Sequence, residues 1–116
     1  MNYQLEIKDN ISIIRVQSER ITHAEAPDMK TTFLKLLTEE TTIFVLNLSK
    51  LNFMDSTGLG AMLFGLRQAE ANDKEIIFCG LSDKIKSLVR IARLDSILEI
   101  YTTEDEAIKE ILEDRN

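Results

Sequence analysis

The stretch that decides the fold is Phe53-Met54-Asp55-Ser56-Thr57-Gly58-Leu59-Gly60. An apolar run at residues 43–48 precedes it and predicts a buried strand. After it, apolar residues recur at spacings of three and four, which predicts a helix over residues 56–72. Asp55, Ser56 and Thr57 each carry a side-chain oxygen that can cap a helix N-terminus by accepting a bond from a free backbone N–H group. One cap is enough, so the additional hydroxyls are candidates for chemistry.

Ser56 is predicted to hold its hydroxyl at the positive end of this helix. A phosphate placed there would meet free N–H groups and a favourable helix dipole. Gly58 and Gly60 carry no side chain, which lets a partner backbone or a phosphate approach closely. The residues alone leave a second interpretation open, in which the stretch is an ordinary N-cap followed by glycines that permit tight helix packing.

The seven residues from Met54 to Gly60 resemble the signature of STAS-domain proteins of the anti-sigma factor antagonist family. In that bacterial family the first serine after the aspartate is phosphorylated by a kinase that is itself an anti-sigma factor, and that position is Ser56 here. The resemblance extends over nearly the whole chain in element order and length. It implies that Ser56 is the phosphorylation site. The residues predicted to bind the kinase are Asp55, Ser56, Thr57, Gly58, Leu59, Gly60, Ala61, Phe64 and Thr22.

The resemblance also implies a mechanism of partner switching that regulates transcription indirectly. The unmodified protein binds the kinase, which then releases its sigma factor. Phosphorylation of Ser56 weakens the complex, and a phosphatase restores the unmodified form. The protein would have no catalytic activity and no cofactor of its own.

The chain departs from the family pattern in the loop before the first predicted helix. Many members carry Gly-x-x-Asp there, whereas Glu19 and Thr22 occupy the two positions in this sequence. The second acid near the phosphorylation site is therefore missing. Thr22 can donate or accept a hydrogen bond but brings no charge.

Length and composition predict one domain over residues 1–116, with 44% apolar residues and no proline-rich or glycine-rich linker. The net charge of −6 argues against direct binding of nucleic acid, so control of transcription would act through another protein. The sequence shows neither a signal peptide nor an apolar run that approaches the ~20 residues of a membrane span. This predicts a cytoplasmic protein without membrane insertion. The single cysteine, Cys79, and the single histidine, His23, predict neither a disulfide nor a metal site.

The rest of the pattern predicts an α/β fold with a mostly parallel sheet, an antiparallel edge strand from an N-terminal hairpin, and about four helices. Strands are expected at 3–8, 11–16, 43–48, 75–79 and 97–101. The first strand alternates Tyr3, Leu5 and Ile7 with polar residues and is expected to be half-buried. Other helices are expected to start near Glu25 or Ala26, after Ser82, and after Thr103, where Glu106 completes a capping box. The helix after Ser82 is expected to bury Ile85, Leu88, Val89 and Ala92.

Phe64 lies away from the apolar stripe of the helix that follows Ser56. Gly58, Ala61 and Gly65 form a strip of small residues on another side of that helix. Phe64 is therefore either an exposed anchor for a partner, since aromatic residues are enriched at interface hot spots, or the filling of a secondary pocket.

Two other functions are considered. The same fold can serve as a STAS subunit that is not switched, in a signalling scaffold or attached to a membrane transporter. The second alternative is a small hydrolase or phosphotransferase, in which Ser56 is the nucleophile, His23 is the base and Asp55 orients the histidine. The sequence leaves the oligomeric state open.

Overall fold

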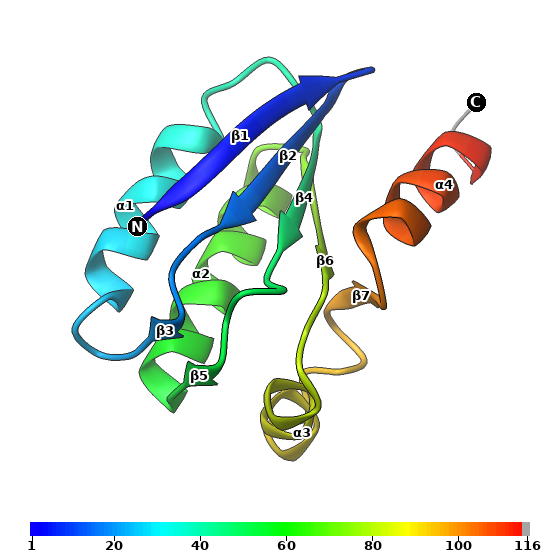
Figure 1. The fold of residues 1–116 in the computed structure, drawn as a ribbon. Helices are drawn as coiled ribbons and strands as arrows, with labels where there is room; N and C mark the ends of the chain where they lie inside the picture. Colours follow the sequence, from blue (N-terminus) through cyan, green and yellow to red (C-terminus); the bar gives the residue numbers. More distant parts are fainter. Residues whose placement is uncertain (115–116) are drawn as a thin grey trace.

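The computed structural model describes residues 1–114 and shows a sheet with helices on both faces (Figure 1). Within these residues the strands are β1 (Tyr3–Lys8), β2 (Ile11–Val16), β3 (Arg20–Ile21), β4 (Ile43–Asn47), β5 (Phe53–Met54), β6 (Glu75–Cys79) and β7 (Glu99–Tyr101). The helices are α1 (Ala26–Leu36), α2 (Ser56–Ala71), α3 (Asp83–Ile91) and α4 (Glu104–Asp114).

The main sheet has the strand order β1-β2-β4-β6-β7. β1 pairs with β2 in antiparallel register, and the other neighbours are parallel. The predicted α/β fold with its antiparallel edge strand is therefore confirmed. β4, at the centre, continues into the loop that leads to Ser56, so the candidate site lies beyond the carboxyl ends of the parallel strands, where such sheets usually bind partners.

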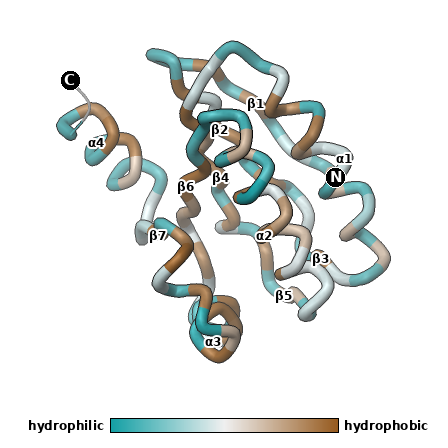
Figure 2. Tube along the Cα trace, turned by 180° about the vertical axis from the view of Figure 1, so that it is seen from behind, coloured by the Kyte–Doolittle hydropathy of each residue, from teal (hydrophilic) through white to brown (hydrophobic). Residues whose placement is uncertain are grey.

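Successive side chains of the central strands point to opposite faces, and each face has its own core. Phe44 and Leu46 of β4 pack with α1, α2 and α3, whereas Val45 packs with Ala107 and Ile111 of α4. Figure 2 shows the hydrophobic residues concentrated in β4 and β6, between these layers. The buried Cys79 belongs to the α4 side of the core, and burial raises its pKa to about 12, which keeps the thiol protonated and unreactive.

Helices α1 and α2 pack closely because α2 has no side chain at Gly65. A Cβ at that position would lie 2.7 Å from atoms of the Phe33 ring. Ala61, on the same strip, is fully buried. The strip of small residues therefore serves contacts within the protein.

A charged contact joins α4 to the sheet. Arg15 of β2 donates two hydrogen bonds to the Glu104 carboxylate, from Nε at 2.9 Å and from Nη2 at 2.8 Å. Asn47 donates a third at 2.9 Å. The Arg15 bonds are the main reason why the pKa of Glu104 is lowered.

Three expectations need correction. The edge strand β1 is more exposed than predicted, because Leu5 and Ile7 remain 41% and 55% exposed beyond the cover of α1, and only Tyr3 packs against the core. Ala92 is exposed, since α3 ends one residue before it. Glu106 accepts a hydrogen bond from the Thr102 N–H group, so the predicted capping box with Thr103 closes only in one direction, through the bond from Glu106 N to Thr103 Oγ1.

Candidate functional site

A second, two-stranded sheet positions the candidate site. β3 and β5 pair in parallel register, Arg20 with Phe53 and Ile21 with Met54. The Asp55 N–H group extends this pairing to the Ile21 carbonyl at 3.4 Å. The loop that begins at Thr22 therefore lies beside the start of α2, although more than thirty residues separate them in the sequence.

Asp55 is the N-cap of α2. Its backbone is extended, and its Oδ1 accepts a hydrogen bond from the Gly58 N–H group at 2.8 Å. Its Oδ2 accepts a second bond from the His23 N–H group at 3.1 Å. These bonds lower the pKa of Asp55, and the bond from Gly58 has the largest effect. Asp55 is therefore kept ionised. One carboxylate thus holds the two loops together and carries a negative charge at the helix start.

Ser56 and Thr57 occupy the first two positions of α2, and both side chains are exposed. Because Asp55 caps the helix, neither hydroxyl is needed as a cap. Within residues 1–114 the Ser56 hydroxyl makes no hydrogen bond. Ser56 therefore presents a free hydroxyl to solvent at the positive end of a helix of 16 residues.

The two glycines of the motif have different surroundings. A Cβ at Gly58 would lie 2.2 Å from the Ile21 carbonyl oxygen, so this glycine lets α2 approach β3. A Cβ at Gly60 would meet nothing within 4 Å. The close approach allowed by Gly58 is to the protein's own backbone, whereas Gly60 faces open space beside Ser56.

The remaining predicted partner-binding residues are covered to different extents. Leu59, Ala61 and Thr22 are buried in the fold. Phe64 is half-buried, and the Nζ of Lys30 lies 5.6 Å from its ring centroid. Ser56, Thr57 and Gly60 are thus the predicted residues with an exposed surface, and Asp55 and Phe64 contribute a part of theirs.

Glu25 belongs to this site and was not predicted. Its Oε1 accepts hydrogen bonds from the Thr22 N–H group and the Thr22 hydroxyl, both at 2.9 Å, and these bonds lower the pKa of Glu25. An ionised acid therefore lies in the loop from which the family aspartate is missing. The spacing Thr-x-x-Glu, at Thr22 and Glu25, is that of a capping box. This spacing is the feature of the sequence that could have identified Glu25.

Comparison with known proteins identifies the family. The family model for the STAS domain matches residues 2–107. The chain belongs to the STAS domain family.

Three known proteins are similar to this chain in sequence or in fold. The anti-sigma-B factor antagonist of Listeria monocytogenes is 33% identical over 110 residues, which cover 91% of this chain and 95% of that protein. A STAS domain protein of Planctomyces limnophilus, an anti-sigma-factor antagonist, superposes with a TM-score of 0.85 at 15% identity, covering 95% of this chain and 97% of that one. The phosphorylated form of SpoIIAA, a Bacillus cell fate determinant, superposes with a TM-score of 0.69 at 24% identity. The match covers 95% of this chain and 99% of that one.

The STAS domain does not assemble the serine triad considered above. His23 Nδ1 lies 3.8 Å from Asp55 Oδ2, but the imidazole is 82% exposed and, within residues 1–114, makes no hydrogen bond to Ser56. A nucleophilic serine needs a base within hydrogen-bond reach. In the same part of the chain no three His, Cys, Asp or Glu side chains are arranged to hold a metal ion, and no helix has the length and apolar composition to cross a membrane.

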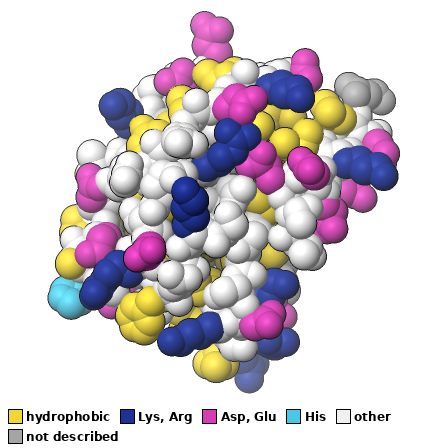
Figure 3. All heavy atoms as spheres, in the orientation of Figure 1, with side chains coloured by type: hydrophobic (Ala, Val, Ile, Leu, Met, Phe, Trp, Pro, Cys, Tyr) yellow, Lys and Arg dark blue, Asp and Glu magenta, His cyan; other side chains and the backbone are white. Residues whose placement is uncertain are grey.

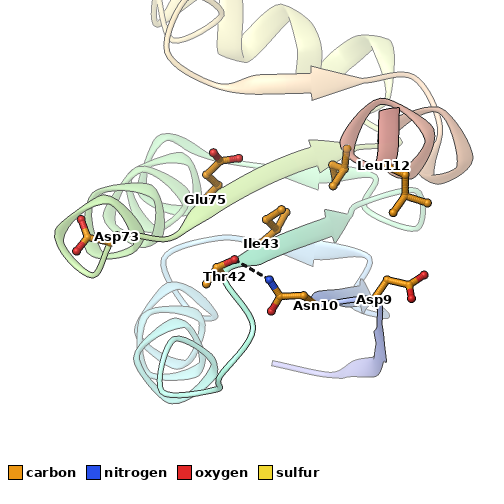
Figure 4. A pocket seen from close by; sticks show the side chains of 8 residues that line it. Asp9, Asn10, Thr42, Ile43, Asp73, Glu75 and Leu112 are labelled. Atoms are coloured by element: carbon orange, nitrogen blue, oxygen red, sulfur yellow. Dashed lines mark hydrogen bonds between the residues drawn. The ribbon is translucent and has the colours of Figure 1, made fainter. Parts of the chain in front are cut away.

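A pocket of about 430 Å³ lies at the other end of the STAS sheet, where the parallel strands begin (Figure 4). Asn10 donates a hydrogen bond to Thr42 across its wall at 3.0 Å. Its acidic lining comes from Asp9, Asp73 and Glu75. This pocket is separate from Ser56, which lies on an open surface.

Proposed function

We propose that this STAS domain is an anti-sigma factor antagonist that is switched by phosphorylation of Ser56. The observation that carries the proposal is the free, exposed hydroxyl of Ser56 on the first turn of α2, beside the ionised Asp55. The names of the relatives support the class of function, and the existence of a phosphorylated form of SpoIIAA supports the modification.

The unmodified protein binds an anti-sigma factor kinase through the surface around Ser56, and the kinase releases its sigma factor. In the phosphoryl transfer, Ser56 Oγ forms a bond to the γ-phosphorus of ATP while the bond between that phosphorus and the β–γ bridging oxygen breaks. ADP leaves, and the hydroxyl proton passes to a base of the kinase. A phosphatase later hydrolyses the phosphoserine.

Electrostatics explains why the modification ends the interaction. The phosphate adds about −1.5 to −2 charges and three acceptor oxygens. The helix N-terminus tolerates this charge within the free protein. A partner that covers the site must instead desolvate two adjacent anions, the phosphate and Asp55, and this desolvation opposes binding.

The test is phosphorylation by the purified anti-sigma factor kinase with ATP, followed by mapping of the phosphate by mass spectrometry. Stoichiometric modification is expected on Ser56, and Thr57→Ala should still be modified on Ser56, whereas Ser56→Ala should not be modified. Because Asp55 is the cap, Ser56→Ala should change the stability of the fold by no more than about 0.5 kcal/mol. Phosphate mainly on Thr57 would refute the assignment of the residue, and the lack of stoichiometric modification would favour a STAS subunit that is not switched.

A further inference from the structure

An apolar groove opens between β5 and α3. It has a volume of about 220 Å³ and is lined by Met54, Lys84, Ile85, Ser87, Leu88 and Ile91. We call it the α3 groove. Met54 and Ile85 are buried and form its floor, whereas Ile91 at its edge is 80% exposed and the neighbouring Phe53 is 44% exposed. Apolar groups exposed together in this way are typical of a binding site.

A basic side chain, Lys84, lies among the residues that line the α3 groove. Its Nζ lies 5.3 Å from the Phe53 ring centroid, whereas Arg90, whose Nη2 lies 3.5 Å from Ser87 Oγ, lines a neighbouring pocket together with Lys86 and Asp95. Residues 83–93 contain four basic residues and one acidic residue, Asp83, in a chain whose net charge is −6. Figure 3 shows hydrophobic and basic side chains, with an acidic one among them, at the bottom of the molecule over α3 and β5. The surface that complements this groove is an apolar side chain beside an acidic residue.

The α3 groove is continuous with the phosphorylation site. Phe53 and Met54 form β5 and are followed directly by Asp55 and Ser56. The start of α2 and the whole of α3 lie at the same end of the molecule (Figure 1). A partner that covers Ser56 therefore reaches the groove without crossing any other element.

We propose that the α3 groove anchors the kinase that phosphorylates Ser56, by taking up an apolar side chain of the kinase while an acidic kinase residue pairs with Lys84. This proposal rests on the proposed function. An anchor away from the reacting hydroxyl supplies affinity that does not depend on the state of Ser56. The anchor contributes to binding of both forms, and the phosphate weakens only the contacts around Asp55 and Ser56.

The experiment uses the anti-sigma factor kinases encoded in the source genome, purified and assayed one by one. The kinase that transfers phosphate from ATP to Ser56 is the probe. Its affinity is measured by calorimetry for the full chain, for Ile91→Ser and for Lys84→Glu, with Leu34→Ser and Lys35→Glu of α1 as matched controls. Leu34, which is 49% exposed, and the exposed Lys35 match the chemistry of the two groove positions on another helix.

Each groove variant is expected to bind the kinase about tenfold more weakly than the wild type, and the controls are expected to bind as the wild type does. Wild-type affinity of both groove variants, with Ser56 still phosphorylated, overturns the anchor and leaves the proposed function standing. A wild-type dimer that Ile91→Ser converts to a monomer without loss of kinase affinity also overturns it, because the occupant is then a second copy. If no kinase modifies Ser56, the proposed function fails and the anchor fails with it.

Discussion

Gly58 and Gly60 look equivalent in the sequence, but only Gly58 is constrained by its surroundings. A Cβ at Gly58 would meet the Ile21 carbonyl oxygen, and backbone atoms of a paired strand cannot move aside as a flexible side chain can. Gly58→Ala is therefore expected to destabilise the fold by about 1–3 kcal/mol. Gly60→Ala, in open space on a helix, should be neutral or should stabilise by up to about 1 kcal/mol. Urea unfolding of both variants measures the difference, and equal stabilities would contradict the tight contact between α2 and β3.

The cap of α2 shows how far single residues can be predicted from the sequence. Asp55, Ser56 and Thr57 are all able to cap, and the sequence does not choose between them. The choice depends on contacts with distant residues, since the Asp55 carboxylate also accepts the His23 N–H group. The family motif predicts Ser56 as the phosphorylation site, and the cap formed by Asp55 explains why the Ser56 hydroxyl is free.

Among the helices, α2 carries both core and surface contacts, and Phe64 lies at their boundary. Half-buried against Lys30, it should contribute less to stability than a core residue such as Phe33. Phe64→Ala is expected to cost about 1–2 kcal/mol of stability, against ~3–5 for Phe33→Ala, and to weaken kinase binding. Chemical denaturation and calorimetry measure the two effects. A core-sized loss of stability with unchanged affinity per folded molecule would show that Phe64 only fills a pocket.

Helix α4 is attached to the sheet in part by the contact between Arg15 and Glu104, and this part of its attachment depends on pH. Since the folded state lowers the pKa of Glu104, this stabilisation is present above the unfolded value of about 4.3 and is lost as the pH falls through the folded value. Glu104→Gln should reduce stability by about 1 kcal/mol at pH 7, and this difference should vanish in strongly acidic solution. Glu113→Gln, at an exposed position, is the control. A difference that persists unchanged at low pH would contradict the charged contact.

The elements that were predicted and those that were missed differ in length. Strands of five or six residues are long enough to show a pattern, either an alternation of apolar positions as in β1 or a continuous apolar run as in β4 and β6. The two-residue strands β3 and β5 are too short for any repeat, yet they bring Thr22 and Asp55 together. The exposure of Leu5 and Ile7 was also missed, because alternation identifies an apolar face but does not tell whether a helix covers it.

The whole molecule is acidic, so any partner meets an overall negative charge with a basic surface at α3. Because the net charge is already −6, a further negative charge at Ser56 changes the charge of the whole molecule little. Its effect is therefore expected to be local. Ser56→Asp introduces one charge and two oxygens, whereas the phosphate introduces about −1.5 to −2 charges and three oxygens. The substitution should weaken kinase binding, but less than phosphorylation does.

The most direct measurement compares the affinities of unmodified, Ser56-phosphorylated and Ser56→Asp protein for the anti-sigma factor kinase by titration calorimetry. Circular dichroism verifies that all three forms are folded. Partner switching predicts tight binding of the unmodified form, intermediate binding of Ser56→Asp, and binding of the phosphorylated form that is weaker by at least about tenfold, or ~1.4 kcal/mol. Equal affinities for the unmodified and phosphorylated forms, with both folded, would contradict it.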